Sequence, residues 1–119
     1  MSIYKRFELV TLKGSAGDVT VVRLNDARIV EESVIRELGD ELLKVVNVEK
    51  RNFLVVNFTK VEFLSSAALN KLILLERAAK AAGGKIRVCG LRKEIAQIFT
   101  LTRLDKLFEI KADEKSALT

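Results

Sequence analysis

The 119 residues fit one compact domain with a single core, and an apolar fraction of 49% excludes general disorder. No apolar run approaches the ~20 residues that a membrane-spanning helix needs, so no membrane segment is expected. The net charge of +5 comes from scattered basic residues with acidic residues between them nearly everywhere. No aromatic residue is interleaved in the densest basic cluster, which consists of Lys80, Lys85, Arg87, Arg92 and Lys93. This pattern favours a solvated basic surface over direct nucleic-acid binding.

The first half of the chain predicts a hairpin, a helix and a buried strand. Residues 7–12 and 19–24 read as strands around a Gly-Ser-Ala-Gly-Asp turn, and the short connection predicts an antiparallel pair. Helical spacing runs from about Glu31 to Val46, with one apolar stripe made of Val34, Ile35, Leu38, Leu42, Val45 and Val46. Residues 52–58 are β-rich and apolar on both faces, as expected of a buried strand.

The second half predicts two further helices that alternate with strands. The expected elements are a helix from about Ser66 to Ala82, a strand over 85–90, a shorter helix over 92–101, a strand over 107–110 and a helical turn from Asp113. Strand–helix–strand units favour parallel pairing. We therefore predict an α/β domain: a mixed β-sheet of four to five strands with helices packed mainly on one face.

The sequence contains few of the residue types and motifs that catalytic sites use. The chain has no histidine, which removes Ser-His-Asp and Cys-His arrangements and most metal sites. Neither a P-loop nor a dinucleotide-binding fingerprint occurs, because the Gly83-Gly84 pair follows a helix and acts as its stop. The single cysteine, Cys89, lies in an apolar run and reads as a buried side chain in a reducing, cytoplasmic environment. We expect no enzyme activity, no cofactor and no bound metal.

The serine pair Ser65-Ser66 stands where a strand-like run ends and a helix begins. On a wheel of 100° per residue, the buried side of this helix holds Ala68, Leu72, Leu75, Ala79 and Ala82, with Leu69 on the flank. The outward face holds Ser66, Asn70, Ile73, Leu74 and Arg77. Two large apolar residues thus fall on a face that is otherwise polar.

Two interpretations of this pattern stay open on the residues alone. Ser65 or Ser66 is an N-cap, and Ile73 and Leu74 pack against a neighbouring helix. Alternatively, the outward face binds a partner and carries a hydroxyl at its upper end. A phosphate on that hydroxyl would suit the free N–H groups and the dipole of a helix start.

Residues 57–110 resemble the second half of a STAS domain, in particular that of a single-domain anti-sigma factor antagonist. The first shared feature is a strand that ends in an aromatic residue, followed by two small or polar residues and Ser-Ala-Ala-Leu at a helix start. The second is the helix stop and strand in residues 81–90. The third is the run I-x-x-I-F-x-L-T-x-L-D-K-L-F over residues 95–108. The order of predicted elements matches over residues 1–119, as expected of a single STAS domain.

The resemblance implies a signalling switch rather than an enzyme. In such antagonists the serine at the helix start is phosphorylated by a serine kinase that is also the anti-sigma factor. The unphosphorylated antagonist binds that kinase and frees the sigma factor, and a PP2C-type phosphatase resets the switch. Ser66 falls at the phosphoacceptor position, and Ser65 stands where many members have aspartate, which makes Ser65 a rival acceptor. The loop before the first helix, residues 25–33, lacks the Gly-x-x-Asp pattern of many antagonists.

The expected partner-binding residues are Ser65, Ser66, Asn70, Ile73, Leu74 and Arg77. The expected partners are the anti-sigma factor/serine protein kinase and the phosphatase, and self-association is left open. The alternative is a STAS adaptor without phosphorylation, a subunit of a transporter ATPase or of a sensory scaffold complex.

Overall fold

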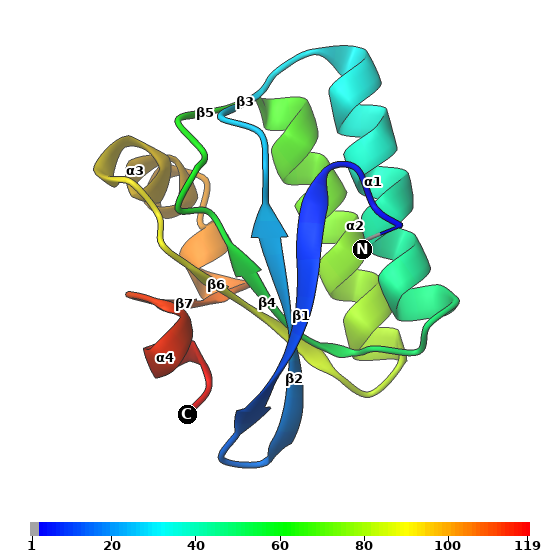
Figure 1. The fold of residues 1–119 in the computed structure, drawn as a ribbon. Coiled ribbons are helices and arrows are strands. Elements are labelled where there is room, and N and C mark those ends of the chain that lie inside the picture. The colour runs from blue at the N-terminus through cyan, green and yellow to red at the C-terminus, as the bar shows by residue number, and fades with distance from the viewer. Residues whose placement is uncertain (1–2) are drawn as a thin grey trace.

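Five strands form a mixed sheet in the order β1-β2-β4-β6-β7 in the computed structural model, which describes residues 3–119 (Figure 1). β1 (Phe7–Gly14) and β2 (Gly17–Leu24) form the predicted antiparallel hairpin. β4 (Phe53–Asn57), β6 (Lys85–Cys89) and β7 (Glu109–Lys111) then add in parallel. The predicted α/β fold with a mixed sheet is confirmed.

Two long helices cover one face of this sheet. α1 (Glu32–Asn47) and α2 (Ser66–Ala81) run side by side, and each connects two neighbouring parallel strands (Figure 1). α3 (Lys93–Leu101) and a 3-10 helix, η1 (Leu104–Lys106), connect β6 to β7. The short helix α4 (Glu114–Ala117) packs against β4, β6 and β7, on the opposite face of the sheet (Figure 1). No helix among residues 3–119 combines the length and the apolar character needed to cross a bilayer.

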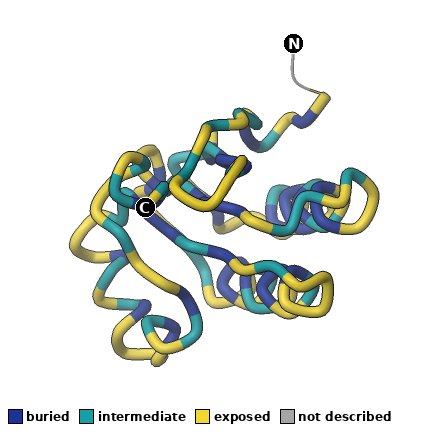
Figure 2. The backbone as a smooth tube through the Cα atoms, turned by 90° about the horizontal axis from the view of Figure 1, so that it is seen from below, coloured by how far each residue is buried: buried dark blue, intermediate teal, exposed yellow. Residues whose placement is uncertain are grey.

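The main core lies between the sheet and the helices. The stripe of α1 packs into it as predicted, with Val34 only half-buried at its margin and the other five residues buried. Phe99 sits between two other rings, 5.9 Å from that of Phe58 and 6.0 Å from that of Phe108 in edge-to-face geometry. Figure 2 shows how buried and exposed positions alternate along the helices and strands. This periodic burial is what the apolar spacing of the sequence predicts.

A smaller cluster lies on the other face of the sheet. It consists of the buried residues Val21, Val55, Cys89 and Ala117. The first three belong to adjacent strands, and Ala117 reaches them from α4. Cys89 is therefore buried, as the sequence predicts.

The structure also contains a second, two-stranded sheet, which the sequence did not predict. β3 (Arg28–Ile29) and β5 (Phe63–Leu64) pair in parallel, so that Arg28 is opposite Phe63 and Ile29 is opposite Leu64. Runs of two residues are too short to show the alternation that identifies a strand. The pair joins the segment before α1 to the segment before α2.

The last strand begins later than predicted. The chain makes the 3-10 turn of η1 first, and Arg103 before it has a left-handed backbone with φ of 61°. Leu107 follows this turn and Phe108 is buried in the main core. The strand is thus displaced to Glu109–Lys111, and the predicted helical turn follows as α4.

Candidate functional site

Ser65 is the N-cap of α2 and is tied to its surroundings. Its Oγ accepts a hydrogen bond from the backbone N–H of Ala68 at 3.2 Å. Its own backbone N–H donates to the carbonyl of Ile29 at 3.1 Å, and its carbonyl accepts from the N–H of Leu69 at 3.1 Å. The half-buried Ser65 thus satisfies one of the orphan N–H groups of the helix start.

Ser66 has a different environment although it is the adjacent residue. It is the first residue of α2 and is exposed, and within residues 3–119 its hydroxyl has no hydrogen-bond partner. The first turn of the helix contains no acidic side chain. A negative charge added here would meet free N–H groups and the positive end of a 16-residue helix.

The outward face of α2 is narrower than the wheel predicts. Asn70 and Arg77 are exposed, and Leu74 keeps 39% of its surface exposed. Ile73, in contrast, is half-buried and packs against the main core. For Ile73 the interpretation as a packing residue therefore applies, whereas Leu74 stays accessible. The reason is that α2 packs against both the sheet and α1, so its contacts cover more than one side.

Leu69 and Glu76 of α2 are buried, whereas Ala82, just after its end, is exposed. Leu69, placed on the flank by the wheel, is buried. Glu76 is only 3% exposed, and its carboxylate lies 3.5 Å from the ammonium group of Lys80 one turn on. The prediction that Ala82 is buried is wrong, because Ala82 is the exposed C-cap that precedes Gly83 at φ of 82°.

A groove of about 560 Å³ opens beside Ser65, between the β3–β5 pair and α3. Its apolar wall includes Phe63, which is 51% exposed, and Ile98 of α3. The guanidinium of Arg28 lies 4.5 Å from the centre of the Phe63 ring, in cation–π contact. The groove is lined by Arg28, Val30, Glu62, Phe63, Leu64, Ser65, Arg92, Glu94, Ile95 and Ile98.

Sequence reasoning missed this groove because it depends on the β3–β5 pairing. That pairing brings residues 28–30, from the loop before α1, next to the start of α2. The loop therefore contributes to the neighbourhood of Ser65 although it lacks the Gly-x-x-Asp pattern. The aromatic Phe63, two residues before Ser65, is the one signal in the sequence that could have pointed to it.

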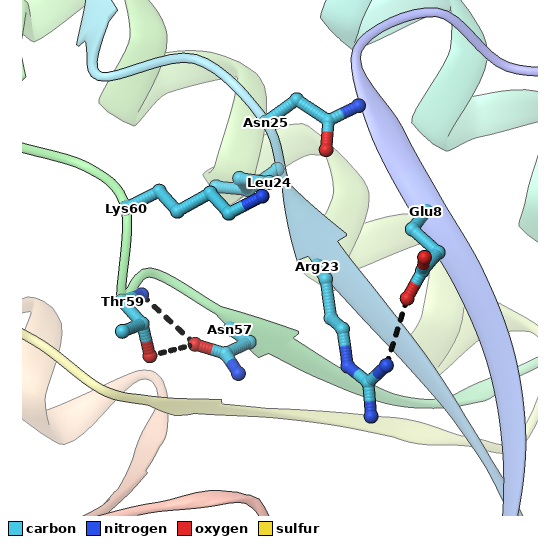
Figure 3. Close-up of a pocket in the computed structure, with 7 residues that line it drawn as sticks. All are labelled: Glu8, Arg23, Leu24, Asn25, Asn57, Thr59 and Lys60. Atoms are coloured by element: carbon cyan, nitrogen blue, oxygen red, sulfur yellow. Dashed lines mark hydrogen bonds and ion pairs between the residues drawn. The ribbon is translucent and has the colours of Figure 1, made fainter.

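A smaller pocket of about 190 Å³ lies at the carboxyl ends of β2 and β4 (Figure 3). Arg23 donates to Glu8 at 2.7 Å, and the side-chain oxygen of Asn57 accepts from the N–H and the hydroxyl of Thr59 at 2.8 and 2.5 Å (Figure 3). The Arg23–Glu8 pair joins β2 to β1, and the bonds to Asn57 stabilise the turn after β4. Within residues 3–119 no cluster of three or more Cys, Asp or Glu side chains is placed to hold a metal ion.

Comparison with known proteins agrees with this architecture. The family model of the STAS domain matches residues 15–117. An anti-sigma factor antagonist from Mycobacterium paratuberculosis is similar in structure, with a TM-score of 0.75 and 23% identity over 94% of this chain and 91% of that one. The Bacillus cell fate determinant SpoIIAA in its phosphorylated form gives a TM-score of 0.67 and 14% identity over 92% of this chain and 94% of that one.

A chain of the stressosome, a signal integration and transduction hub, is also similar. Its TM-score is 0.64, and its identity is 22% over 92% of both chains. At such identities these structures share the fold with this chain. The family match itself extends from the β-hairpin to α4 and includes the whole of α2 with its two serines. The chain therefore belongs to the STAS domain family.

Proposed function

We propose that this chain is an anti-sigma factor antagonist, a protein-binding module that is switched by phosphorylation. It binds an anti-sigma factor with serine kinase activity and so releases a sigma factor. Phosphorylation of Ser66 ends this binding, and a PP2C-type phosphatase restores it. Family membership and the likeness to antagonists of known structure support the proposal.

The observation that carries the proposal is the contrast between the two serines. A kinase needs a hydroxyl that can approach the γ-phosphate of ATP as a free nucleophile. Ser66 offers an exposed hydroxyl without a partner among residues 3–119. Ser65 is half-buried, and its oxygen is engaged by the N–H of Ala68. Ser66 is therefore the favoured acceptor and Ser65 the residue that holds the helix start in place.

The proposed docking face runs from Ser66 along the exposed side of α2. Ser65 lies at its upper rim, Asn70 and Leu74 follow at intervals of one turn, and Arg77 ends it. Ile73 supports this face from beneath. A phosphate on Ser66 adds about −1.5 to −2 charges at pH 7. The helix start accepts that charge, whereas an apolar partner surface docked over Ser66 must desolvate the phosphate and an acidic one is repelled by it.

The test is to incubate the protein with its cognate kinase and ATP and to map the phosphate by mass spectrometry. We expect phosphate on Ser66, full phosphorylation of Ser65→Ala and none of Ser66→Ala. Ser66→Asp should bind the kinase weakly in a pull-down assay, with Asn47→Asp at the far end of α1 as a charge-matched control that binds normally. Phosphate on neither serine, together with full binding by Ser66→Asp, would refute the proposal.

A second candidate is an adaptor that works without phosphorylation in a sensory scaffold or a transporter ATPase. It is favoured by the residue before Ser66, which is a capping serine instead of a carboxylate, and by the likeness to a stressosome chain. In that case Ser66→Ala and Ser66→Asp both co-purify with the partner as well as the unmodified chain does.

A further inference from the structure

Residues 112–119, here called the strap, cross the face of the sheet that α1 and α2 leave open (Figure 1). Backbone hydrogen bonds hold both ends of the strap. The N–H of Gly90 donates to the carbonyl of Ala112 at 3.1 Å, and the N–H of Ser15 donates to that of Leu118 at 3.0 Å. The guanidinium of Arg87 also donates to the carbonyl of Ala117 at 2.7 Å.

One side chain of the strap, Glu114, collects three hydrogen bonds from two different strands. Arg23 of β2 donates to it from Nε at 2.8 Å and from Nη2 at 2.9 Å, in the two-pronged geometry that gives strong pairs. Asn57 of β4 donates to the same carboxylate at 2.5 Å. The side chain is only 19% exposed. Glu114 thus joins the middle of the strap to the sheet.

The apolar contact under the strap is small by comparison. Ala117 is its one buried residue, and it covers Val21, Val55 and Cys89. The large side chains of the main core lie on the other side of the sheet and do not touch the strap. A segment with few buried apolar contacts needs less free energy to open locally than the core needs to unfold.

The strap is also built to move as one piece. Asp113 caps α4, accepting from the N–H of Ser116 at 2.8 Å, and the hydroxyl of Ser116 accepts from the N–H of Asp113 in return. These bonds join residues of the strap to one another, and neither of them reaches the sheet. Ala112, next to the end of β7, is the position at which the chain would turn away from the sheet.

We propose that the strap opens as a unit with Glu114 as its latch, and that opening uncovers Cys89 and its apolar neighbours while the sheet, α1 and α2 stay folded. The closed form protects the thiol in two ways. It denies access, and burial, with smaller contributions from Glu114 and Asp113, raises the pKa of Cys89 to about 11. A partner that binds only the open form would shift the equilibrium toward it.

The single cysteine allows a direct test, because every alkylated thiol is Cys89. The protein is treated with iodoacetamide under native conditions and the rate of modification is followed by mass spectrometry. We expect Glu114→Ala to react at least about tenfold faster than the unmodified chain, since the loss of even one hydrogen bond to a charged group corresponds to about that factor and three are lost. The rate should change little at low urea concentrations, because a local opening exposes little surface.

Glu8→Ala is the matched control. Glu8 pairs with the same Arg23, at 2.7 Å, but belongs to β1 and not to the strap. Its removal should leave the rate of Cys89 modification within about twofold of the unmodified chain, as for an exposed ion pair. Equal acceleration by both substitutions would overturn the proposal, because it would indicate general destabilisation.

Hydrogen exchange tests the same opening without any substitution. The N–H groups of Ser15 and Gly90 donate to the two ends of the strap. They should exchange with a common opening equilibrium and faster than the sheet amides of β4. Exchange of both only with global unfolding would show that the strap does not open by itself.

Discussion

Glu114 shows how a single carboxylate can connect the stability of this domain to pH. The hydrogen bonds from Arg23 hold the pKa of Glu114 below its usual range, the bond from Asn57 acts in the same direction, and burial opposes both. A carboxylate whose pKa is lower in the folded state stabilises that state above its pKa in the unfolded chain, which is ~4.3. This stabilisation is lost as the pH falls through the folded-state value.

We therefore predict that Glu114→Gln flattens the acid limb of the stability profile. At pH 7 the unmodified chain should have the higher free energy of unfolding, and the difference should shrink as the pH falls below ~4. The check is a series of urea unfolding curves recorded by circular dichroism at several pH values. Parallel profiles for the two proteins would contradict the assignment.

At the scale of elements, the start of α2 depends on one hydroxyl and on one very short strand pair. The Oγ of Ser65 caps the helix, and its backbone N–H joins it to Ile29 at the end of β3. The position of Ser66 is thus set by groups that belong to its neighbours. A substitution at Ser65 should therefore change the stability of the helix start, whereas one at Ser66 should change only the exposed surface.

This difference gives a prediction for stability. Ser65→Ala should lower the free energy of unfolding by about 1 kcal/mol, whereas Ser65→Asp should preserve most of it because aspartate is an equally good N-cap. Ser66→Ala should change it by less than about 0.5 kcal/mol, as expected of an exposed residue. Chemical denaturation of the four proteins measures all these values. A larger loss for Ser66→Ala than for Ser65→Ala would reverse the assignment of the cap.

The elements with strong periodicity could be predicted from the sequence, and those set by long-range pairing could not. The stripe from Ile35 to Val46 and the alternation in β1 and β2 are local signals, and they identify α1 and the hairpin. The pairing of Arg28 with Phe63 joins positions far apart in the chain and leaves no periodic trace. The groove beside Ser65 depends on that pairing, so the sequence indicated the serines but not the cavity next to them.

At the scale of the molecule, the sheet separates two apolar clusters of very different size. The main core holds the four buried phenylalanines and most of the buried residues, while the cluster on the other face consists of three strand residues and Ala117 of the strap that covers them. The packing that unfolds cooperatively therefore lies mainly between the sheet and the face that α1 and α2 cover. Phe99 connects α3 to this core through its contacts with Phe58 and Phe108.

Truncation of the Phe99 side chain should destabilise the whole domain. We predict that Phe99→Ala lowers the free energy of unfolding by about 3–5 kcal/mol, since it removes a fully buried aromatic side chain and leaves a cavity. Leu101→Ala, on the same helix but 83% exposed, is the control and should cost less than about 0.5 kcal/mol. Thermal unfolding followed by circular dichroism compares the two. Similar melting temperatures for both variants would show that α3 is not part of the cooperative core.

The parallel pairing of β3 with β5 has an electrostatic consequence for the starts of α1 and α2. Because the two strands run in the same direction and each leads into a helix, α1 and α2 begin at the same edge of the domain. Their peptide dipoles therefore point the same way, and the partial positive charges of both helix starts add at that edge. An anionic group on Ser66 would thus lie in a favourable field that the backbone creates. That field would persist even if every lysine and arginine on the surface were replaced.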